Sequence, residues 1–174
     1  MKVYVVRHGQ TELNKKGLIN GFLDDALTPE GEEQARATAL LLPDTIKRIY
    51  SSSLGRARET AKILNEKLGV PITFHDELKE VNFGVLNGTP FLEEYQIRHR
   101  AQDYDWRPSG ECFEDVKERV LVILKKIKAE NKDGEALIVA HGGIIRLMHL
   151  LEFGEPMGEI KNAALYNFDL DKIL

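Results

Sequence analysis

Two short runs of apolar residues constrain what this chain can fold into more than any other feature. Residues 3–6 (VYVV) and 136–140 (ALIVA) contain only aliphatic or aromatic side chains, several of them β-branched. Such continuous runs are typical of strands buried on both faces, as in a parallel sheet with helices on each side. Three weaker runs, at residues 48–50, 72–74 and 165–168, are expected to add strands to the same sheet.

Helical patterns lie between the predicted strands. Thr28 is a suitable N-cap before Pro29, and the helix that follows is predicted to end at Pro43. From Leu54 onward, apolar residues recur at spacings of three and four until Gly69 closes a second helix. The alternation of strands and helices predicts a three-layer α/β/α fold with a largely parallel central sheet. The first helix and a later one are expected to face the core through Ala35, Ala39 and Leu42, and through Phe113, Val116, Val120, Ile123, Leu124 and Ile127.

Composition excludes several classes of protein. The 174 residues suit one domain, so we expect a single domain over residues 1–174. The net charge is −4 and no basic cluster is present, which argues against a nucleic-acid partner. No apolar stretch approaches the roughly 20 residues of a membrane span, and the N-terminal apolar run is too short for a signal peptide. Cys112 is the only cysteine, so no intramolecular disulfide can form, and we expect a cytoplasmic location.

Polar motifs follow three of the predicted strands directly. They are residues 7–11 (RHGQT), with Asn14 just beyond, 51–57 (SSSLGRA) and 141–143 (HGG). Because the carboxyl ends of parallel strands meet at one edge of a sheet, these motifs are expected to lie together. Arginine side chains and the amides at helix starts are suited to bind phosphate oxygens. The sequence therefore predicts a phosphate site at this edge.

The order of these motifs along nearly the whole chain resembles the histidine phosphatase superfamily, also called phosphoglycerate mutase-like. The family's Arg-His-Gly-(Glu or Gln)-Thr signature matches residues 7–11, and its His-Gly-Gly matches residues 141–143. Three further family stretches match residues 24–31, 52–61 and 78–84 in register. The resemblance implies the phosphoglycerate mutase-like fold, with residues 88–110 as a short cap insertion.

The resemblance also implies a role for each matched residue. His8 would be the nucleophile that forms a phosphohistidine, and Glu80 would donate a proton to the leaving oxygen. Neither a metal nor another cofactor is expected. The phosphoryl oxygens would be held by Arg7, Asn14, Arg56, His141 and the amide of Gly142.

These roles agree with the chemistry of phosphoryl transfer. An imidazole nucleophile divides one difficult displacement into two easier steps, provided that one ring nitrogen is unprotonated. The other ring nitrogen of His8 is expected to bond a backbone carbonyl, which would fix the tautomer. Cationic side chains can stabilise the charge on the transferred group without a metal. A well-placed acid such as Glu80 raises the rate by roughly 10²–10⁴.

The chain length favours hydrolysis over isomerisation. The resemblance implies that the mutases of the superfamily have longer chains, with a larger cap and a C-terminal tail over the site. The cap segment of this chain, residues 88–110, is short by comparison. We therefore predict a metal-independent phosphomonoesterase that acts on a small phosphorylated metabolite. A mutase of the phosphoglycerate type and a non-catalytic phosphate-binding module are the alternatives. The α-ribazole phosphatases of cobamide synthesis resemble this chain in length and motif layout, as do broader sugar-phosphate phosphatases. A homodimer is possible, since related proteins are sometimes dimers.

Several residues near the cap are candidates to contact the leaving group, although surface or packing roles explain each of them equally well. The remaining histidines, His75, His99 and His149, lack the spacing of a zinc site, and no P-loop motif is present. Arg58 lies two residues from Arg56 and is expected on the helix surface. The leaving-group candidates are Asn20, Phe22, Arg98, Arg100, Tyr104, Trp106 and Arg107.

Overall fold

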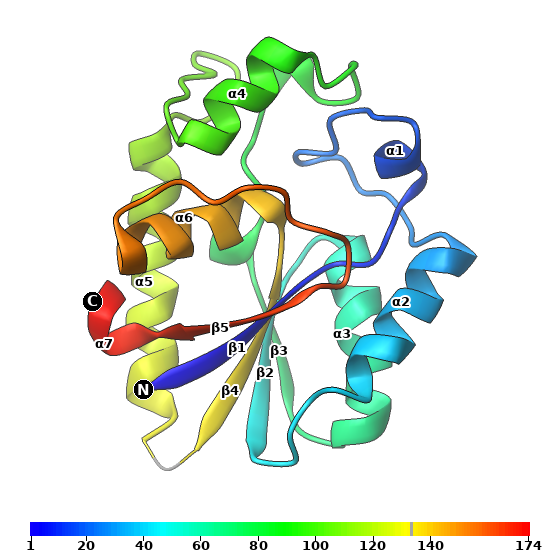
Figure 1. The fold of residues 1–174 in the computed structure, drawn as a ribbon, viewed down its shortest axis with the longest axis vertical. Helices are drawn as coiled ribbons and strands as arrows, with labels where there is room; N and C mark the ends of the chain where they lie inside the picture. Colours follow the sequence, from blue (N-terminus) through cyan, green and yellow to red (C-terminus); the bar gives the residue numbers. More distant parts are fainter. Residues whose placement is uncertain (133) are drawn as a thin grey trace.

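A computed structural model describes residues 1–132 and 134–174. Its strands form one five-stranded sheet in the order β3-β2-β4-β1-β5 (Figure 1). β4 pairs in parallel with both β1 and β2, and β3 pairs in parallel with β2, whereas β5 runs antiparallel to β1. The predicted α/β fold with a largely parallel sheet is confirmed. In chain order the elements are β1 (Lys2–Arg7), α1 (Glu12–Lys15), α2 (Pro29–Ala39), β2 (Ile46–Ser52), α3 (Gly55–Leu68), β3 (Ile72–His75), α4 (Glu93–Ala101), α5 (Phe113–Glu130), β4 (Glu135–Ala140), α6 (Gly142–Phe153), β5 (Leu165–Asp169) and α7 (Leu170–Ile173).

The sheet is covered on both faces because alternate side chains of its central strands enter two different cores. On β4, Ile138 packs in the core formed with α5 and α6, whereas Leu137 and Val139 pack in the core formed with α2 and α3. Figure 1 shows these two helix pairs on opposite sides of the sheet. A strand with apolar neighbours on both faces needs apolar residues throughout, which explains the uninterrupted run in the sequence.

Two element boundaries differ from the sequence prediction. α2 ends at Ala39 rather than at Pro43, because the amides of Leu41 and Leu42 bond carbonyls three residues back in a tightened turn. Leu42 is nevertheless buried, as expected. β2 runs from Ile46 to Ser52 and is longer than the predicted residues 48–50 because it pairs with β4 on one side and β3 on the other.

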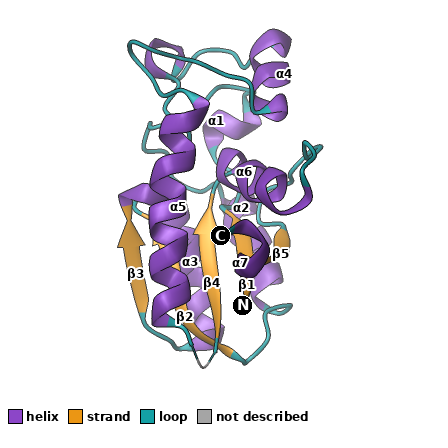
Figure 2. Cartoon of the chain, turned by 90° about the vertical axis from the view of Figure 1, so that its left-hand side faces the viewer, coloured by secondary structure: helices purple, strands orange, loops and turns teal. Residues whose placement is uncertain are grey.

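The parallel strands all point toward the end of the molecule where α1 and α4 lie (Figures 1 and 2). β1 ends at Arg7, β2 at Ser52 and β4 at Ala140, so the three polar motifs begin at one edge of the sheet. Residues 88–110 contain α4, which lies beyond this edge. In the described part of the chain, no helix is long and apolar enough to cross a membrane.

Candidate active site

His8 lies at the centre of the site, immediately after β1. Its side chain is 2% exposed, and its Nδ1 lies 2.8 Å from the carbonyl oxygen of Gly9. A carbonyl only accepts, so Nδ1 carries the proton and Nε2 keeps its lone pair. Burial lowers the pKa of His8 well below 6.5, and the charges of Arg56 and Arg7 lower it further. The imidazole is therefore neutral at pH 7 and suited to act as a nucleophile through Nε2.

A close approach of two backbone segments fixes the loop that carries His8. A Cβ on Gly9 would lie 2.3 Å from the carbonyl oxygen of Gly31, and a Cβ on Gly31 would lie 2.1 Å from that of Gln10. The start of α2 thus packs directly against residues 9 and 10, which only glycine permits. The Gly9 amide also donates to Thr60 Oγ1 at 3.0 Å, so α3 holds the same loop.

His141, the second histidine of the site, follows β4. Its ring centroid lies 5.1 Å from that of His8, and its Nε2 lies 2.7 Å from Ser52 Oγ at the end of β2. The same hydroxyl oxygen accepts from the Leu54 amide at 3.3 Å, so it can donate its own proton to Nε2. Nδ1 would then carry a proton. This atom is buried and has no hydrogen-bond partner within the described chain, which makes it a suitable donor to a phosphoryl oxygen.

Two arginines lie near the histidines, one fully buried and one, Arg7, partly buried. Arg56 is fully buried and donates to the carbonyl oxygens of Leu23 at 2.7 Å and Gly21 at 2.8 Å. Burial lowers the pKa of Arg56 to about 10, so its guanidinium keeps its charge at neutral pH. Arg7 donates to the Ile160 carbonyl. The Nε atoms of both arginines are buried and unpaired among the described residues, and they are donors suited to an oxyanion.

Glu80 is held by the N-terminus of α6. The Gly143 amide donates to its Oε1 at 3.1 Å and its Oε2 at 3.3 Å, and the Val81 amide donates to Oε1 at 2.9 Å. The favourable field at a helix N-terminus adds to these bonds. A Cβ on Gly143 would lie 2.3 Å from Oε1, so this position admits the carboxylate only because it is glycine.

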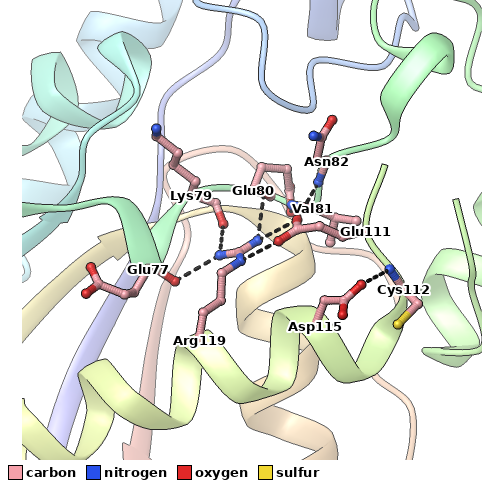
Figure 3. Close-up of polar contacts among 9 residues, drawn as sticks. All are labelled: Glu77, Lys79, Glu80, Val81, Asn82, Glu111, Cys112, Asp115 and Arg119. Atoms are coloured by element: carbon pink, nitrogen blue, oxygen red, sulfur yellow. Dashed lines mark hydrogen bonds and ion pairs between the residues drawn. The ribbon is translucent and has the colours of Figure 1, made fainter. Parts of the chain in front are cut away.

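Arg119 of α5 holds the backbone on which Glu80 is carried (Figure 3). Its Nη1 donates to the carbonyls of Glu77 at 2.8 Å and Lys79 at 2.7 Å, and its Nη2 donates to that of Glu80 at 3.0 Å. Nε and Nη2 also form two bonds to the Glu111 carboxylate, at 2.7 and 2.9 Å. One guanidinium thus satisfies four partners, and it fixes the segment that carries the predicted proton donor.

Asn14 is oriented by a network of amide side chains. Its Nδ2 donates to Asn20 Oδ1 at 2.8 Å, and its Oδ1 accepts from Asn162 Nδ2 at 3.1 Å. Asn162 also donates to the backbone carbonyl of His8 at 3.2 Å. Asn20 in turn donates to Thr11 Oγ1 at 2.9 Å. The loop after β1 is thereby connected to residues that precede β5.

Two cavities meet at the site and share the side chains of Arg7, Asn14 and His99 in their walls. The smaller has a volume of about 70 Å³, and both His8 and Glu80 line it. The larger has a volume of about 420 Å³ and extends toward α4. The nucleophile and the proton donor predicted from the sequence therefore line one small cavity beside a larger one that can admit a substrate.

Comparison with known proteins agrees with this geometry. The family model of the histidine phosphatase superfamily (branch 1) matches residues 3–173. The chain belongs to the histidine phosphatase superfamily.

Individual relatives include both phosphatases and mutases. The chain is 36% identical to an uncharacterized phosphatase of Bacillus subtilis, over 98% of this chain and 86% of that protein. It is 32% identical to a probable phosphoglycerate mutase of Shigella boydii, over 99% of this chain and 84% of the relative. A mycobacterial glucosyl-3-phosphoglycerate phosphatase, solved with VO₃, has a similar structure, with a TM-score of 0.85 and 27% identity over 95% of this chain and 91% of that one.

In this member of the superfamily, the leaving-group candidates divide into two sets. Asn20 lines the smaller cavity, and Arg100 lines the larger. The other candidates lie outside the described walls of both cavities. Trp106 stacks against Phe83, with ring centroids 5.4 Å apart, and against Tyr104 at 6.0 Å. The candidates in this second set are Phe22, Arg98, Tyr104, Trp106 and Arg107, and their contact with a leaving group stays a prediction.

Four side chains of the site were not assigned a role from the sequence. Ser52 begins a stretch that matches the family, but its bond to His141 depends on the pairing of β2 with β4. Arg146 lies four residues after Gly142, a spacing that places it on the same face of α6. Arg119 and Asn162 carry no local signal, because most of their partners here are distant in sequence. Within the described ranges, no three His, Cys, Asp or Glu side chains gather as a potential metal site.

Proposed function

We propose that this histidine phosphatase hydrolyses phosphate monoesters of small metabolites through a phosphohistidine on His8, without a metal. The observation that carries the proposal is the tethered, neutral imidazole of His8 in the same small cavity as Glu80. A nucleophile and a proton donor at one cavity are the two groups that this chemistry requires.

The first step forms a bond from His8 Nε2 to phosphorus while the bond from phosphorus to the ester oxygen breaks. Glu80, in its acid form, gives its proton to the departing oxygen. Arg7 and the Nδ1–H of His141 stabilise the charge on the transferred oxygens.

The second step returns the site to its starting state. A water molecule attacks phosphorus and gives a proton to the Glu80 carboxylate, and the bond from phosphorus to Nε2 breaks as inorganic phosphate leaves. In a mutase, an alcohol of the substrate would take the place of this water. The short segment 88–110 supports water as the acceptor, because a smaller cap leaves the intermediate more accessible to it.

The test compares the wild type with His8→Ala and Glu80→Gln on para-nitrophenyl phosphate in EDTA. We expect turnover that survives EDTA and falls at least about a thousandfold in His8→Ala, because the nucleophile is lost. A phosphorylated protein that is stable to base but labile to acid should accumulate in Glu80→Gln.

Metabolite esters then show whether water or an alcohol of the substrate accepts the phosphoryl group. Release of inorganic phosphate from 3-phosphoglycerate or α-ribazole phosphate would support hydrolysis. Isomer exchange without phosphate release would replace the proposal with a mutase, and equal turnover in the wild type and His8→Ala would refute the histidine route.

A further inference from the structure

The larger cavity has a cationic wall, and the two-step chemistry assigns a role to only one of its three arginines, Arg7. Arg7, Arg100 and Arg146 all line it, and Glu159 is the one acidic side chain among its described lining residues. Glu159 is exposed. Burial lowers the pKa of Arg146; the Glu80 carboxylate opposes this shift, whereas the charges of Arg7 and Arg100 add to it, so both of these guanidinium groups repel that of Arg146. Positive charge gathered around a cavity favours an anionic occupant.

Arg146 brings this charge close to the phosphoryl site. A Cβ built on Gly142 would lie 3.2 Å from Arg146 Nη1, 3.8 Å from Arg7 Nε and 4.0 Å from Glu80 Oε2. Arg146 Nη2 donates to the carbonyl of Gly158 at 3.2 Å, whereas its Nε is buried and has no partner in the part of the chain that is described. The guanidinium therefore retains unused donors beside the reacting atoms.

His99 of α4 lies in the wall that the two cavities share. Its ring packs against Phe83, Phe91 and Tyr104, with centroid separations of 5.3, 5.8 and 5.8 Å. Its Nε2 is buried and unpaired among the described residues. A buried ring nitrogen without a partner is costly, and a polar ligand group would satisfy it.

We propose that the larger cavity is a second anion subsite, in which Arg146 and Arg100 bind an oxyanion carried by the alcohol part of the substrate while His99 bonds a neighbouring oxygen. The proposal rests on the proposed function and names the substrate class as phosphate esters with a second anionic group. A carboxylate and a second phosphate share the required chemistry, since both accept bonds from a guanidinium.

Matched esters test the subsite. 3-Phosphoglycerate and glycerol 3-phosphate differ by a carboxylate, and fructose 1,6-bisphosphate and fructose 6-phosphate differ by a second phosphate. In at least one pair, we expect the wild type to hydrolyse the ester that carries a second anionic group with a kcat/KM at least about tenfold higher than that of its matched partner. The pair that shows the preference identifies the oxyanion.

Substitution of Arg146 then tests whether this side chain causes the preference for the second anionic group. In Arg146→Met, kcat/KM for the preferred ester should fall about 10- to 100-fold, whereas that for its matched partner should change less than about threefold. Arg146→Lys should recover part of the loss because the charge is kept. Arg58→Met, which removes an exposed arginine of α3, is the control and should change neither value. Equal losses on both esters of a pair, or no preference in the wild type, would overturn the subsite.

Binding separates this proposal from the proposed function. The His8→Ala protein, which does not cleave, is titrated with both esters of a pair by calorimetry, with and without Arg146→Met. If Arg146→Met weakens binding only of the ester with a second anionic group, the result supports the subsite even if no ester is hydrolysed. In that case only the proposed reaction fails. Equal binding of both esters refutes the subsite even if turnover is observed.

Discussion

The two buried histidines of the site differ in what their ring nitrogens bond. His8 is fixed by a carbonyl, which leaves a lone pair on the opposite nitrogen, whereas His141 is fixed by a hydroxyl that can donate a hydrogen bond to Nε2 and so leave the ring proton on Nδ1. The same side chain can thus serve as a nucleophile at one position and as a hydrogen-bond donor at the other. The proposed role of His141 therefore depends on its contact with Ser52, a residue of β2.

Replacing Ser52 with alanine tests this assignment at the residue scale. The Ser52→Ala protein keeps every group predicted to touch substrate but frees Nε2 of His141, so Nδ1 no longer carries a fixed proton. We expect kcat to fall about fivefold, which corresponds to the roughly 1 kcal/mol of one neutral hydrogen bond. Steady-state kinetics on para-nitrophenyl phosphate, with thermal unfolding to check the fold, measure the effect. Unchanged kcat in a folded variant would contradict the role of Ser52.

At the scale of elements, the position of Glu80, the proposed proton donor, depends on α5 and α6 together. α6 supplies the amide that binds the Glu80 carboxylate, and α5 supplies Arg119, which holds the backbone of residues 77, 79 and 80 (Figure 3). Glu80 lies in an irregular segment between two short 3₁₀ turns. Its geometry is therefore provided by the helices around it.

An Arg119→Met variant should lower kcat about 10- to 100-fold while KM for a small ester changes little, because Glu80 loses its fixed position and the phosphate ligands stay in place. Arg119→Lys should recover only part of the activity, since an ammonium cannot bond three carbonyls and a carboxylate in one plane. A pH–rate profile adds a readout that unfolding alone does not move: the limb that depends on the proton donor should shift or flatten. A rise in KM by a similar factor, with kcat unchanged, would indicate that Arg119 acts in substrate binding instead.

The strands and helices also differ in how far the sequence could predict their contribution to the site. The strand ends that bring His8 and His141 together followed from the apolar runs before them, because parallel strands share an edge. The bonds of Arg119 to the backbone of residues 77, 79 and 80 and those of Asn162 could not be predicted, since they join residues that are distant in the chain and depend on how the elements pack. For Tyr104 and Trp106, composition alone does not distinguish an aromatic wall of a site from an aromatic core, and both lie in the packed cluster.

At the scale of the whole molecule, buried histidines link stability to pH. Burial lowers the pKa values of His8 and His141 well below 6.5 and that of His99 to about 4. In the unfolded chain each would take up a proton near pH 6.5. Between pH 6.5 and about 4 the unfolded chain therefore binds more protons, so the free energy of unfolding decreases as pH falls.

Each such histidine contributes a slope of up to about 1.4 kcal/mol per pH unit in this window. We expect His99→Phe to reduce the slope by about that amount. Urea unfolding from pH 8 to pH 4.5 measures it, and the values at pH 8, where all three histidines are neutral, isolate the packing effect of the new ring. The same slope in both proteins would mean that His99 takes up its proton equally in the folded and unfolded states.

The contact between Gly9 and Gly31 limits how this site can evolve. Each glycine faces main-chain atoms of the other's segment, so a side chain gained at one position cannot be accommodated by shrinking a neighbouring side chain. Such a pair has no compensating partner mutation. The walls of the larger cavity on α4 and α6 are not restricted in this way, because their side chains line open space. A library for directed evolution would keep both glycines fixed and randomise those walls.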